Sequence, residues 1–250
     1  MVSDVKILSV HRLVKIYPKK SQPAINGLTF SITEGEVFGL LGPNGAGKTT
    51  AISIMTTLLK PTSGSLTVCG LDVLRYPAQV RGLIGFVPQE IALYQNLTLR
   101  ENLRFFGRIY GLRGRELTTH ISEFIELVGL EESADSLVFT FSGGMKRRAN
   151  LAAGILHKPK VLFLDEPTVG VDPQSRNLIL ERIAGFKEKI TMVYTTHYME
   201  EAESLCSYVA IMDAGQIIIE GAPAELIQRF PESAALEALF IKLTGKQLRD

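Results

Sequence analysis

The sequence predicts an α/β fold with a mostly parallel sheet, an N-terminal antiparallel β subdomain and an inserted α-helical subdomain. Three observations predict this class. Short apolar runs of strand length alternate with helical patterns, which is typical of a parallel sheet. Residues 5–33 predict two antiparallel strands joined near 18–23, a segment with a proline at each end. Between about 98 and 156 the apolar residues follow a helical period, and no convincing strand occurs.

The individual elements follow from local patterns. Thr98 and Glu101 have the spacing of a capping box and predict a helix that runs to about residue 110. A second helix follows, because five apolar residues share one helix face and Gly129 suits the C-terminal cap. The five residues are Leu117, Ile121, Phe124, Ile125 and Val128. Further strands are predicted over 65–69, 83–87, 161–164, 191–194 and 208–212.

Near the C-terminus, four apolar residues form another helical stripe. We expect this stripe to pack against the sheet, and a dimer or partner surface is the alternative use. The four residues are Leu236, Leu239, Phe240 and Leu243.

One segment matches the nucleotide-phosphate loop, in which a glycine, four residues, a second glycine, a lysine and Ser or Thr follow one another. It follows an apolar strand pattern at 37–41 and precedes a helix predicted over 50–59, so a P-loop NTPase core is expected. Glycines let backbone N–H groups surround phosphate oxygens, and the helix N-terminus adds partial positive charge. We expect Lys48 to reach the β- and γ-phosphates and the Thr49 hydroxyl to ligate Mg²⁺. The predicted contacts are Gly42, Pro43, Asn44, Gly45, Ala46, Gly47, Lys48, Thr49 and Thr50.

Two adjacent carboxylates end the apolar strand predicted at 161–164. At a strand end they would lie at the mouth of a parallel sheet, where ligands bind in open α/β folds. We expect Asp165 to hold Mg²⁺ through water, as the acidic residue that closes such strands does. Glu166, on the other side of the pleat, is placed to polarise an attacking water.

A third motif is the run Phe141-Ser142-Gly143-Gly144-Met145, which precedes a helix predicted over 145–156. It resembles the signature loop of ATP-binding cassette (ABC) ATPases, whose usual form is Leu-Ser-Gly-Gly-Gln. The chain departs from that form at Phe141 and Met145. The centre, Ser142, Gly143 and Gly144, makes the phosphate contacts in the family and is intact. The loop lies nineteen residues before Val161, in the order that the family has it.

The resemblance extends over essentially the whole chain and implies further roles. Tyr17 resembles the aromatic residue that stacks on adenine. Gln89 resembles the glutamine that joins the core to the helical subdomain, contacts Mg²⁺ or water, and faces a permease. Asp172 resembles the loop acid that crosses the dimer interface, and His197 resembles the switch histidine that contacts the γ-phosphate.

Within the family, the residues around 141–148, 168–173 and 243–250 are similar to the exporter branch that handles drugs, sodium, lipids and polymers. In that branch the ATPase is a separate polypeptide and Met is usual at position 145. The resemblance implies an ATP hydrolase that uses ATP and Mg²⁺ and pairs head-to-tail with a second copy around two ATP. It would drive a separate transmembrane permease.

The resemblance also implies a domain organisation. We expect a single ABC ATPase domain over 1–250. Its core and β subdomain are expected at 1–88 and 157–229, its helical subdomain at about 89–156, and a helical tail at about 230–250.

Other ABC functions remain alternatives, namely an importer ATPase, a cluster-assembly ATPase with a soluble partner, and an ATPase acting on nucleic acid or translation. The 94 residues between Gly47 and Ser142 leave no room for the long coiled coil of chromosome-associated types. Translation types usually carry two cassettes in one chain, whereas this sequence contains one.

Composition limits the partners. The net charge is +1, from 27 basic and 26 acidic residues, so we expect no nucleic-acid partner. No apolar run approaches the ~20 residues that span a bilayer. We therefore expect a cytoplasmic chain held at the inner face of the membrane through the permease. Cys69 and Cys206 have no metal-site spacing, and we expect two buried free thiols in a reducing compartment.

Overall fold

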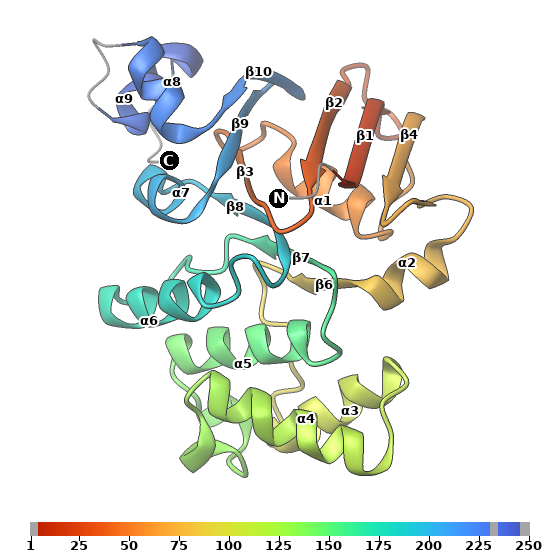
Figure 1. Ribbon diagram of the computed structural model, residues 1–250, viewed down its shortest axis with the longest axis vertical. Helices are drawn as coiled ribbons and strands as arrows, with labels where there is room; N and C mark the ends of the chain where they lie inside the picture. Colours follow the sequence, from red (N-terminus) through yellow and green to blue (C-terminus); the bar gives the residue numbers. More distant parts are fainter. Residues whose placement is uncertain (1–4, 231–234, 246–250) are drawn as a thin grey trace. The chain divides into compact units, whose positions relative to one another are not determined.

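The chain forms two compact units, and the computed structural model describes residues 5–230 and 235–245 (Figure 1). The first unit comprises residues 1–83 and 187–250, and the second comprises residues 84–186. The first unit therefore draws its elements from both ends of the chain.

An antiparallel sheet opens the first unit. Strand β1 pairs with β2 on one side and with β4 on the other, so that Val10 lies opposite both Phe30 and Leu66. All three side chains are buried, which gives the sheet one apolar face. The two predicted N-terminal strands are thus present, and the predicted strand near 65–69 joins the same sheet. The strands are β1 (Lys6–Lys15), β2 (Ile25–Thr33), β4 (Ser63–Val68) and β5 (Leu71–Asp72), in the order β2-β1-β4-β5.

The second sheet of this unit is mostly parallel. Strand β3 lies between β8 and β9 and runs parallel to both. Every residue of β3 and β8 is buried, which explains their continuous apolar sequence. Strand β10 was not predicted; it pairs antiparallel with β9 through a turn in which Ala214 and Gly215 both have positive φ. The strands are β3 (Val37–Leu41), β8 (Thr191–Thr196), β9 (Tyr208–Asp213) and β10 (Gln216–Gly221).

The described residues of the first unit form five helices. The prediction for the first of them, 50–59, is wrong at both ends, because α1 begins at Lys48 and ends at Met55. Thr56 donates its hydroxyl to the carbonyl of Ile52, and Thr57 has a φ of 67°, a left-handed conformation that ends a helix. The helices are α1 (Lys48–Met55), α2 (Pro77–Leu83), α7 (Met199–Leu205), α8 (Pro223–Arg229) and α9 (Leu236–Thr244).

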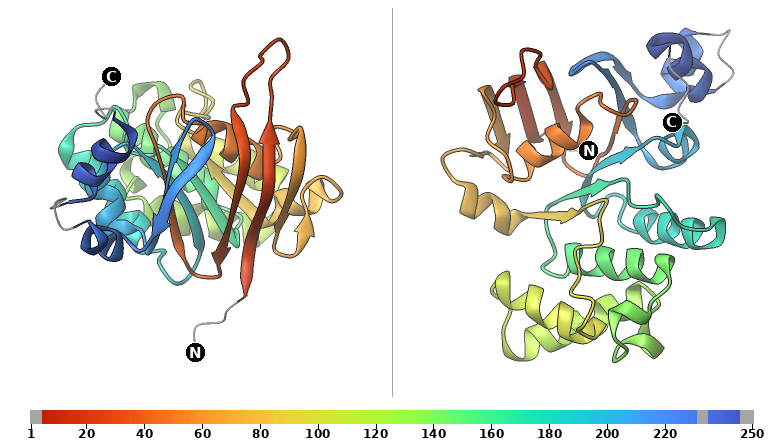
Figure 2. Two further views of the ribbon diagram at one scale, coloured as in Figure 1. Left: turned by 90° about the horizontal axis from the view of Figure 1, so that it is seen from above. Right: turned by 180° about the vertical axis from the view of Figure 1, so that it is seen from behind.

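The C-terminal apolar stripe lies on α9 and is part of the core of this unit. Leu236, Leu239 and Phe240 are fully buried, whereas Leu243 is partly exposed. Helix α9 packs on α7 and α8; Figures 1 and 2 draw α8 and α9 in dark blue and α7 in a lighter blue. The stripe therefore contributes to packing against α7 and α8. Residues 246–250 of the exporter-like tail lie outside the described part of the chain.

The second unit carries two parallel strands and four α-helices. Strands β6 and β7 pair in register from Ile84 with Val161. The predicted capping box is confirmed, since Thr98 accepts from the Glu101 amide and Glu101 accepts from the Thr98 amide. No further strand lies between β6 and β7, although Thr98 and Leu137 form an isolated bridge. The elements are β6 (Ile84–Val87), α3 (Leu99–Ile109), α4 (Gly114–Leu127), two 3-10 turns (Glu131–Ser133 and Val138–Thr140), α5 (Gly143–Ile155), β7 (Val161–Asp165) and α6 (Pro173–Ala184).

The predicted face of α4 is also confirmed. Four of its five predicted apolar residues lie within the helix and are buried, and the fifth, Val128, is its buried C-cap. Gly129 follows with a φ of 62° and donates its amide to the carbonyl of Glu126, as a C-terminal glycine does. Within 5–230 and 235–245, no helix has the length and apolar character required to cross a membrane.

The two cysteines differ in environment. Cys206 is buried beside β3, where a Cβ on Gly39 would lie 2.9 Å from its Sγ. Burial raises the pKa of the Cys206 thiol to about 12. Cys69 is only partly buried, so the expectation of two buried thiols is wrong for this residue. It lies in the turn after β4 with a φ of 50°.

This difference predicts selective labelling at pH 8 with a thiol-reactive disulfide reagent. Cys69 should react in the native protein, whereas Cys206 should react only after unfolding, because the thiolate is the reactive species. The measurement is the number of thiols released before and after denaturant is added. The Cys69→Ser variant is the control and should show no fast phase. Rapid native labelling of that variant would contradict the burial of Cys206.

Candidate nucleotide site

The predicted phosphate loop connects β3 to α1, and two of its positions have room only for glycine. A Cβ on Gly42 would lie 2.5 Å from the carbonyl oxygen of Met212, and one on Gly47 would lie 2.5 Å from that of Ala24. Gly47 also has a φ of 104°, which residues with a side chain rarely adopt. The loop thus passes so close to β9 and to the start of β2 that only glycine fits at both positions.

The unpredicted turn between β9 and β10 supports this loop. The Gly215 amide donates to the carbonyl of Ala46 at 3.0 Å, and the Gly215 carbonyl accepts from the amide of Asn26 at 2.9 Å. Gly215 therefore links the middle of the phosphate loop to β2. At the exposed tip of the loop, Asn44 and Gly45 are open to solvent, and Gly45 has no atom within 4 Å of its Cβ position. That tip leaves space for an anion beside the backbone.

Lys48 lies at the start of α1 with its side chain only 5% exposed. Its Nζ donates to the carbonyl of Gly42 at 2.7 Å and to that of Pro43 at 3.2 Å. These contacts hold the ammonium against the loop, where a bound phosphate would also lie. Thr49 is exposed, and the hydroxyl of Thr50 lies 3.3 Å from that of Tyr17.

Tyr17 follows β1, and its side chain is 39% exposed. The Nζ of Lys15 lies 5.5 Å from the centre of its ring. The contact with Thr50 places the ring beside the first turn of α1, in the same unit as the phosphate loop. An exposed aromatic face at this position is available for a stacked base.

His197 follows β8, and a buried carboxylate that the sequence did not reveal holds Thr196, the residue before it. Glu201 is 1% exposed and accepts from the hydroxyls of Tyr194 and Thr196, each at 2.7 Å. The amide of Tyr198 donates to the Thr196 hydroxyl at 2.9 Å. The two residues next to His197 in the chain are thereby fixed. The available sequence signal was the pair of hydroxyls at 194 and 196, which share one face of a strand, followed five residues later by an acid.

The remaining predicted residues belong to the second unit. Asp165 ends β7 and is 3% exposed, and Glu166 follows with a φ of 47°. A left-handed glutamate is uncommon and costs roughly 1–2 kcal/mol. Such strain persists where the surrounding structure enforces it and is frequent at functional sites. The strained backbone therefore indicates that the conformation of Glu166, immediately after β7, is held by its surroundings.

The signature-like loop is the N-terminus of α5. Ser142 is the N-cap, and its hydroxyl accepts from the Met145 amide at 3.2 Å. Ser142 and Gly143 are exposed, whereas Gly144 is buried against α6. A Cβ on Gly144 would lie 2.2 Å from the Oγ of Ser175, so glycine permits this helix contact. The loop therefore presents free helix amides, which suit phosphate oxygens.

Asp172 lies in the same unit and is the N-cap of α6. Its carboxylate accepts from the Ser175 amide at 3.0 Å. This hydrogen bond is the main cause of a lowered pKa for the Asp172 carboxyl. Gln89 follows β6 with an exposed side chain, and its carbonyl accepts from the guanidinium of Arg147. The structure thus brings Gln89 and the β7–α6 segment into one unit with the signature-like loop.

The donors available for a metal are oxygen atoms. Over 5–230 and 235–245, no group of three His, Cys, Asp or Glu side chains is arranged to hold a metal ion. The predicted ligands Thr49, Gln89 and Asp165 offer a hydroxyl, an amide and a carboxylate. Such oxygen donors fit Mg²⁺, which keeps several waters and takes few protein ligands beside substrate phosphates.

The comparisons with known proteins identify the family. The family model described as "ABC transporter" matches residues 25–169, which is more than half of the chain. The chain belongs to the ABC transporter family. A relative from Bacillus subtilis (strain 168), the linearmycin resistance ATP-binding protein LnrL, is 48% identical over 224 residues, which cover 89% of this chain and 71% of that protein. This membership confirms the prediction of an ATP-binding and ATP-hydrolysing ABC subunit.

Two further matches bear on branch and fold. The Nod factor export ATP-binding protein I of Ralstonia nicotianae is 41% identical over 227 residues, covering 90% of this chain and 70% of that protein. A solved structure of the ATP binding subunit of an ABC transporter superposes with a TM-score of 0.85 at 30% identity, over 95% of this chain and 99% of that one. The predicted exporter branch and the predicted fold class are both confirmed.

Replacing Lys48 with Ala should weaken nucleotide binding while the fold is retained. Charge-assisted hydrogen bonds contribute about 1.5–3 kcal/mol, so affinity should fall roughly 10- to 100-fold. The measurements are titration with a fluorescent ATP analogue, ATP turnover and circular dichroism. Lys187→Ala is the matched control, because that ammonium also donates to a main-chain carbonyl, that of Ser204. Unchanged affinity in well-folded Lys48→Ala protein would exclude the phosphate-loop assignment.

Proposed function

We propose that this ABC chain is the energy-supplying subunit of a membrane exporter and works as an ATP-dependent head-to-tail pair. One observation carries the proposal. The loop with Lys48 and the loop with Ser142 are both intact in one chain, and they belong to different compact units. In the family, each ATP lies between Lys48 of one copy and Ser142 of the other. A symmetric pair then closes two sites around one two-fold axis.

Within each composite site, the side chains take distinct roles. Lys48 and the loop amides bind and neutralise the phosphates, while Tyr17 stacks on adenine. Glu166 polarises the attacking water, and His197 contacts the γ-phosphate. Phosphoryl transfer is largely positioning and charge stabilisation, which the fixed backbone at Glu166 supports.

The interface would include Asp172, which crosses between the two copies close to the partner's site. Thr49, Gln89 and Asp165 would hold Mg²⁺, which supplies charge neutralisation at the β- and γ-phosphate oxygens. The domain organisation follows the family, with a helical subdomain at about 89–156, a core at 1–88 and 157–229, and a tail at about 230–250.

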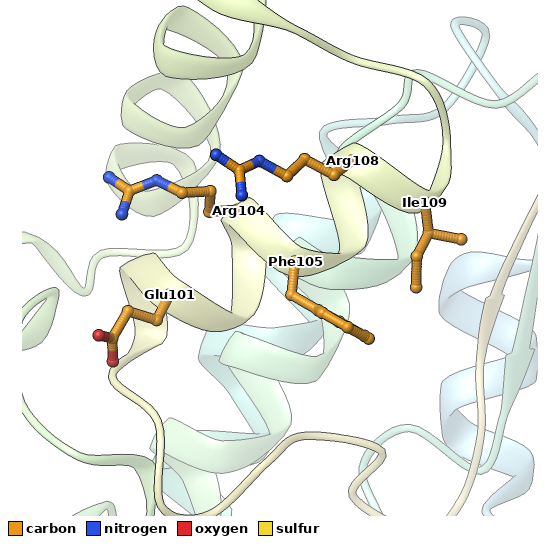
Figure 3. A pocket seen from close by; sticks show the side chains of 5 residues that line it. All are labelled: Glu101, Arg104, Phe105, Arg108 and Ile109. Atoms are coloured by element: carbon orange, nitrogen blue, oxygen red, sulfur yellow. The ribbon is translucent and has the colours of Figure 1, made fainter.

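The helical part of the second unit would contact a separate permease at the cytoplasmic face of the membrane. Figure 3 shows a surface pocket lined from one helix, α3, by two apolar and three charged side chains. None of them belongs to the predicted nucleotide site. Exposed apolar groups beside arginines are typical of protein interfaces. The five residues are Glu101, Arg104, Phe105, Arg108 and Ile109.

This surface continues toward the Gln89 segment. Tyr94 is 52% exposed, and its ring meets that of Phe105 edge-on at 5.0 Å. A helix of the permease seated on α3 would therefore contact the chain that leads to Gln89. The two relatives reported above are named for different compounds, linearmycin and Nod factor. This difference supports a permease, and not the ATPase, as the part that selects the cargo.

Glu166→Gln should preserve ATP binding and reduce turnover by a factor of about 100 or more, because it removes the carboxylate that polarises water. The Mg-ATP complex should accumulate as a dimer, since the step that separates the copies is blocked. The measurement is size-exclusion chromatography with light scattering, together with turnover.

The matched control for this variant is Glu132→Gln, which changes an exposed glutamate of the same unit. It should leave both turnover and association unchanged. A monomer under saturating Mg-ATP, or unchanged turnover in Glu166→Gln, would remove Glu166 from its proposed role.

Head-to-tail pairing predicts complementation between two inactive chains. Lys48→Ala and Ser142→Arg should each fail to associate in Mg-ATP when alone. When the two are mixed, one site combines both substitutions and the other has neither, so association and partial turnover should return. A mixture as inactive as its components would contradict a shared site.

Disulfide trapping checks the geometry of this pair. In a Cys69→Ser background, differently tagged chains carry either Asn44→Cys or Gly143→Cys. A Cβ at Gly143 has no neighbour nearer than 3.8 Å, so cysteine fits there. The crosslink should join the two tags and should require ATP. If a chain with both cysteines crosslinked only internally, head-to-tail pairing would be excluded.

A further inference from the structure

Arg147 joins three segments of the second unit that lie far apart in the sequence. It belongs to the second turn of α5, the helix that begins at the signature-like loop. Its Nη1 donates to the carbonyl of Gln89, 58 residues earlier, and its Nη2 donates at 2.9 Å to the carbonyl of Val169, 22 residues later. One guanidinium thus links α5 to the segments after β6 and after β7.

Both acceptors lie beside residues of the proposed reaction. Gln89 is itself a predicted Mg²⁺ or water contact. The Val169 amide donates to the carbonyl of Glu166 at 3.2 Å, so Val169 closes the turn that carries the strained glutamate. Asp172 follows three residues later on the same connection. The positions of these groups therefore depend on where the Gln89 and Val169 carbonyls are held.

The chemistry of the contact favours a positioning role. A guanidinium is a planar, rigid fork that can donate to two acceptors in fixed directions, whereas an ammonium is a flexible point charge. Arg147 is half-buried, and loss of hydration lowers its pKa, although the charge of Glu166 acts in the opposite direction. It remains charged at neutral pH. Burying this charge against two main-chain carbonyls fixes the backbone at both places.

The next residue provides an internal comparison. Arg148 donates at 2.7 Å and 2.8 Å to the carbonyls of Val128 and Gly129, at the C-terminal end of α4. It has the same side chain, the same helix and the same kind of acceptor as Arg147. Its acceptors, however, belong to the helical subdomain and not to a predicted site segment. Comparing variants of the two arginines therefore distinguishes a general structural role from a role in the reaction.

We propose that Arg147 is a positioning residue for ATP hydrolysis, which holds the Gln89 and Val169 carbonyls to the signature helix. Through these carbonyls it fixes the segments that carry Gln89, Glu166 and Asp172 relative to α5. The proposal rests on the proposed function, because those three residues act in the reaction only if the chain hydrolyses ATP as described. It adds a residue that acts through two main-chain carbonyls.

The experiment compares Arg147→Met with Arg148→Met in the full chain. Arg147→Met should lower kcat about 10- to 100-fold, the scale of a misplacement near 1 Å, and change the affinity for ATP less than about twofold. Amide hydrogen exchange should increase at residues 88–92 and 167–172. Arg148→Met should increase exchange at 128–131 and leave kcat within about twofold.

Arg147→Lys tests whether charge alone is sufficient. Lysine retains the charge but lacks the planar fork, so it should restore little of kcat and little of the exchange protection at 167–172. Full rescue by lysine would overturn the positioning role. Wild-type kcat and exchange in Arg147→Met, or effects matching those of Arg148→Met, would overturn it as well. If Arg147→Met does not fold, Arg147→Gln, which can donate to one carbonyl, takes its place with the same expectations.

The proposed function and the positioning role of Arg147 would be contradicted by different results. If Lys48→Ala and Glu166→Gln retain wild-type turnover, the proposed function is wrong. If those variants are inactive but Arg147→Met turns over normally, only the positioning role is wrong. The exchange measurement needs no activity and reports on the two carbonyl segments directly.

Discussion

The close approach of main chain to main chain around the phosphate loop is the constraint on which the nucleotide site depends. Gly42 and Gly47 leave no room for a Cβ, because carbonyl oxygens of Met212 and Ala24 would lie 2.5 Å away. The loop can therefore lie between β9 and the start of β2. Lys48 is held against the same loop by two carbonyls. A side chain at either glycine would move the loop and its lysine together.

The other site segments are held by single polar side chains that reach from a neighbouring helix. Glu201 of α7 fixes the residues on both sides of His197 through the hydroxyl of Thr196. Arg147 of α5 fixes the carbonyls of Gln89 and Val169. In each case the buried or half-buried charged side chain forms its hydrogen bonds with the segment that it positions. Leaving such a polar group without a hydrogen bond would cost folding free energy. The loops are thus set by the helices behind them and not by their own sequence.

Much of the fold and of the site could be predicted from local patterns. The capping box at Thr98, the apolar face of α4 and the C-terminal glycine at 129 depend on contacts within a few residues, and all are present. The length of α1 could not be predicted, because its end depends on the left-handed conformation of Thr57. Strand β10 was missed because its turn, Ala214-Gly215, lacks the Asn or Asp that usually signals such a hairpin.

The motifs, their order and hence the family were evident in the amino-acid sequence, because glycines, a lysine and paired carboxylates at fixed spacing are required by phosphate chemistry. The positions of most strands could also be predicted, and those of β3 and β8 follow from apolar runs that reflect burial on both faces. The side chains that hold the site segments could be identified only in the folded chain. Arg147, with acceptors 58 residues before it and 22 after it, and Glu201 satisfy groups that no local pattern connects. The hydrogen-bond partners of these two residues depend on which helices pack behind the loops. That packing depends on the whole fold.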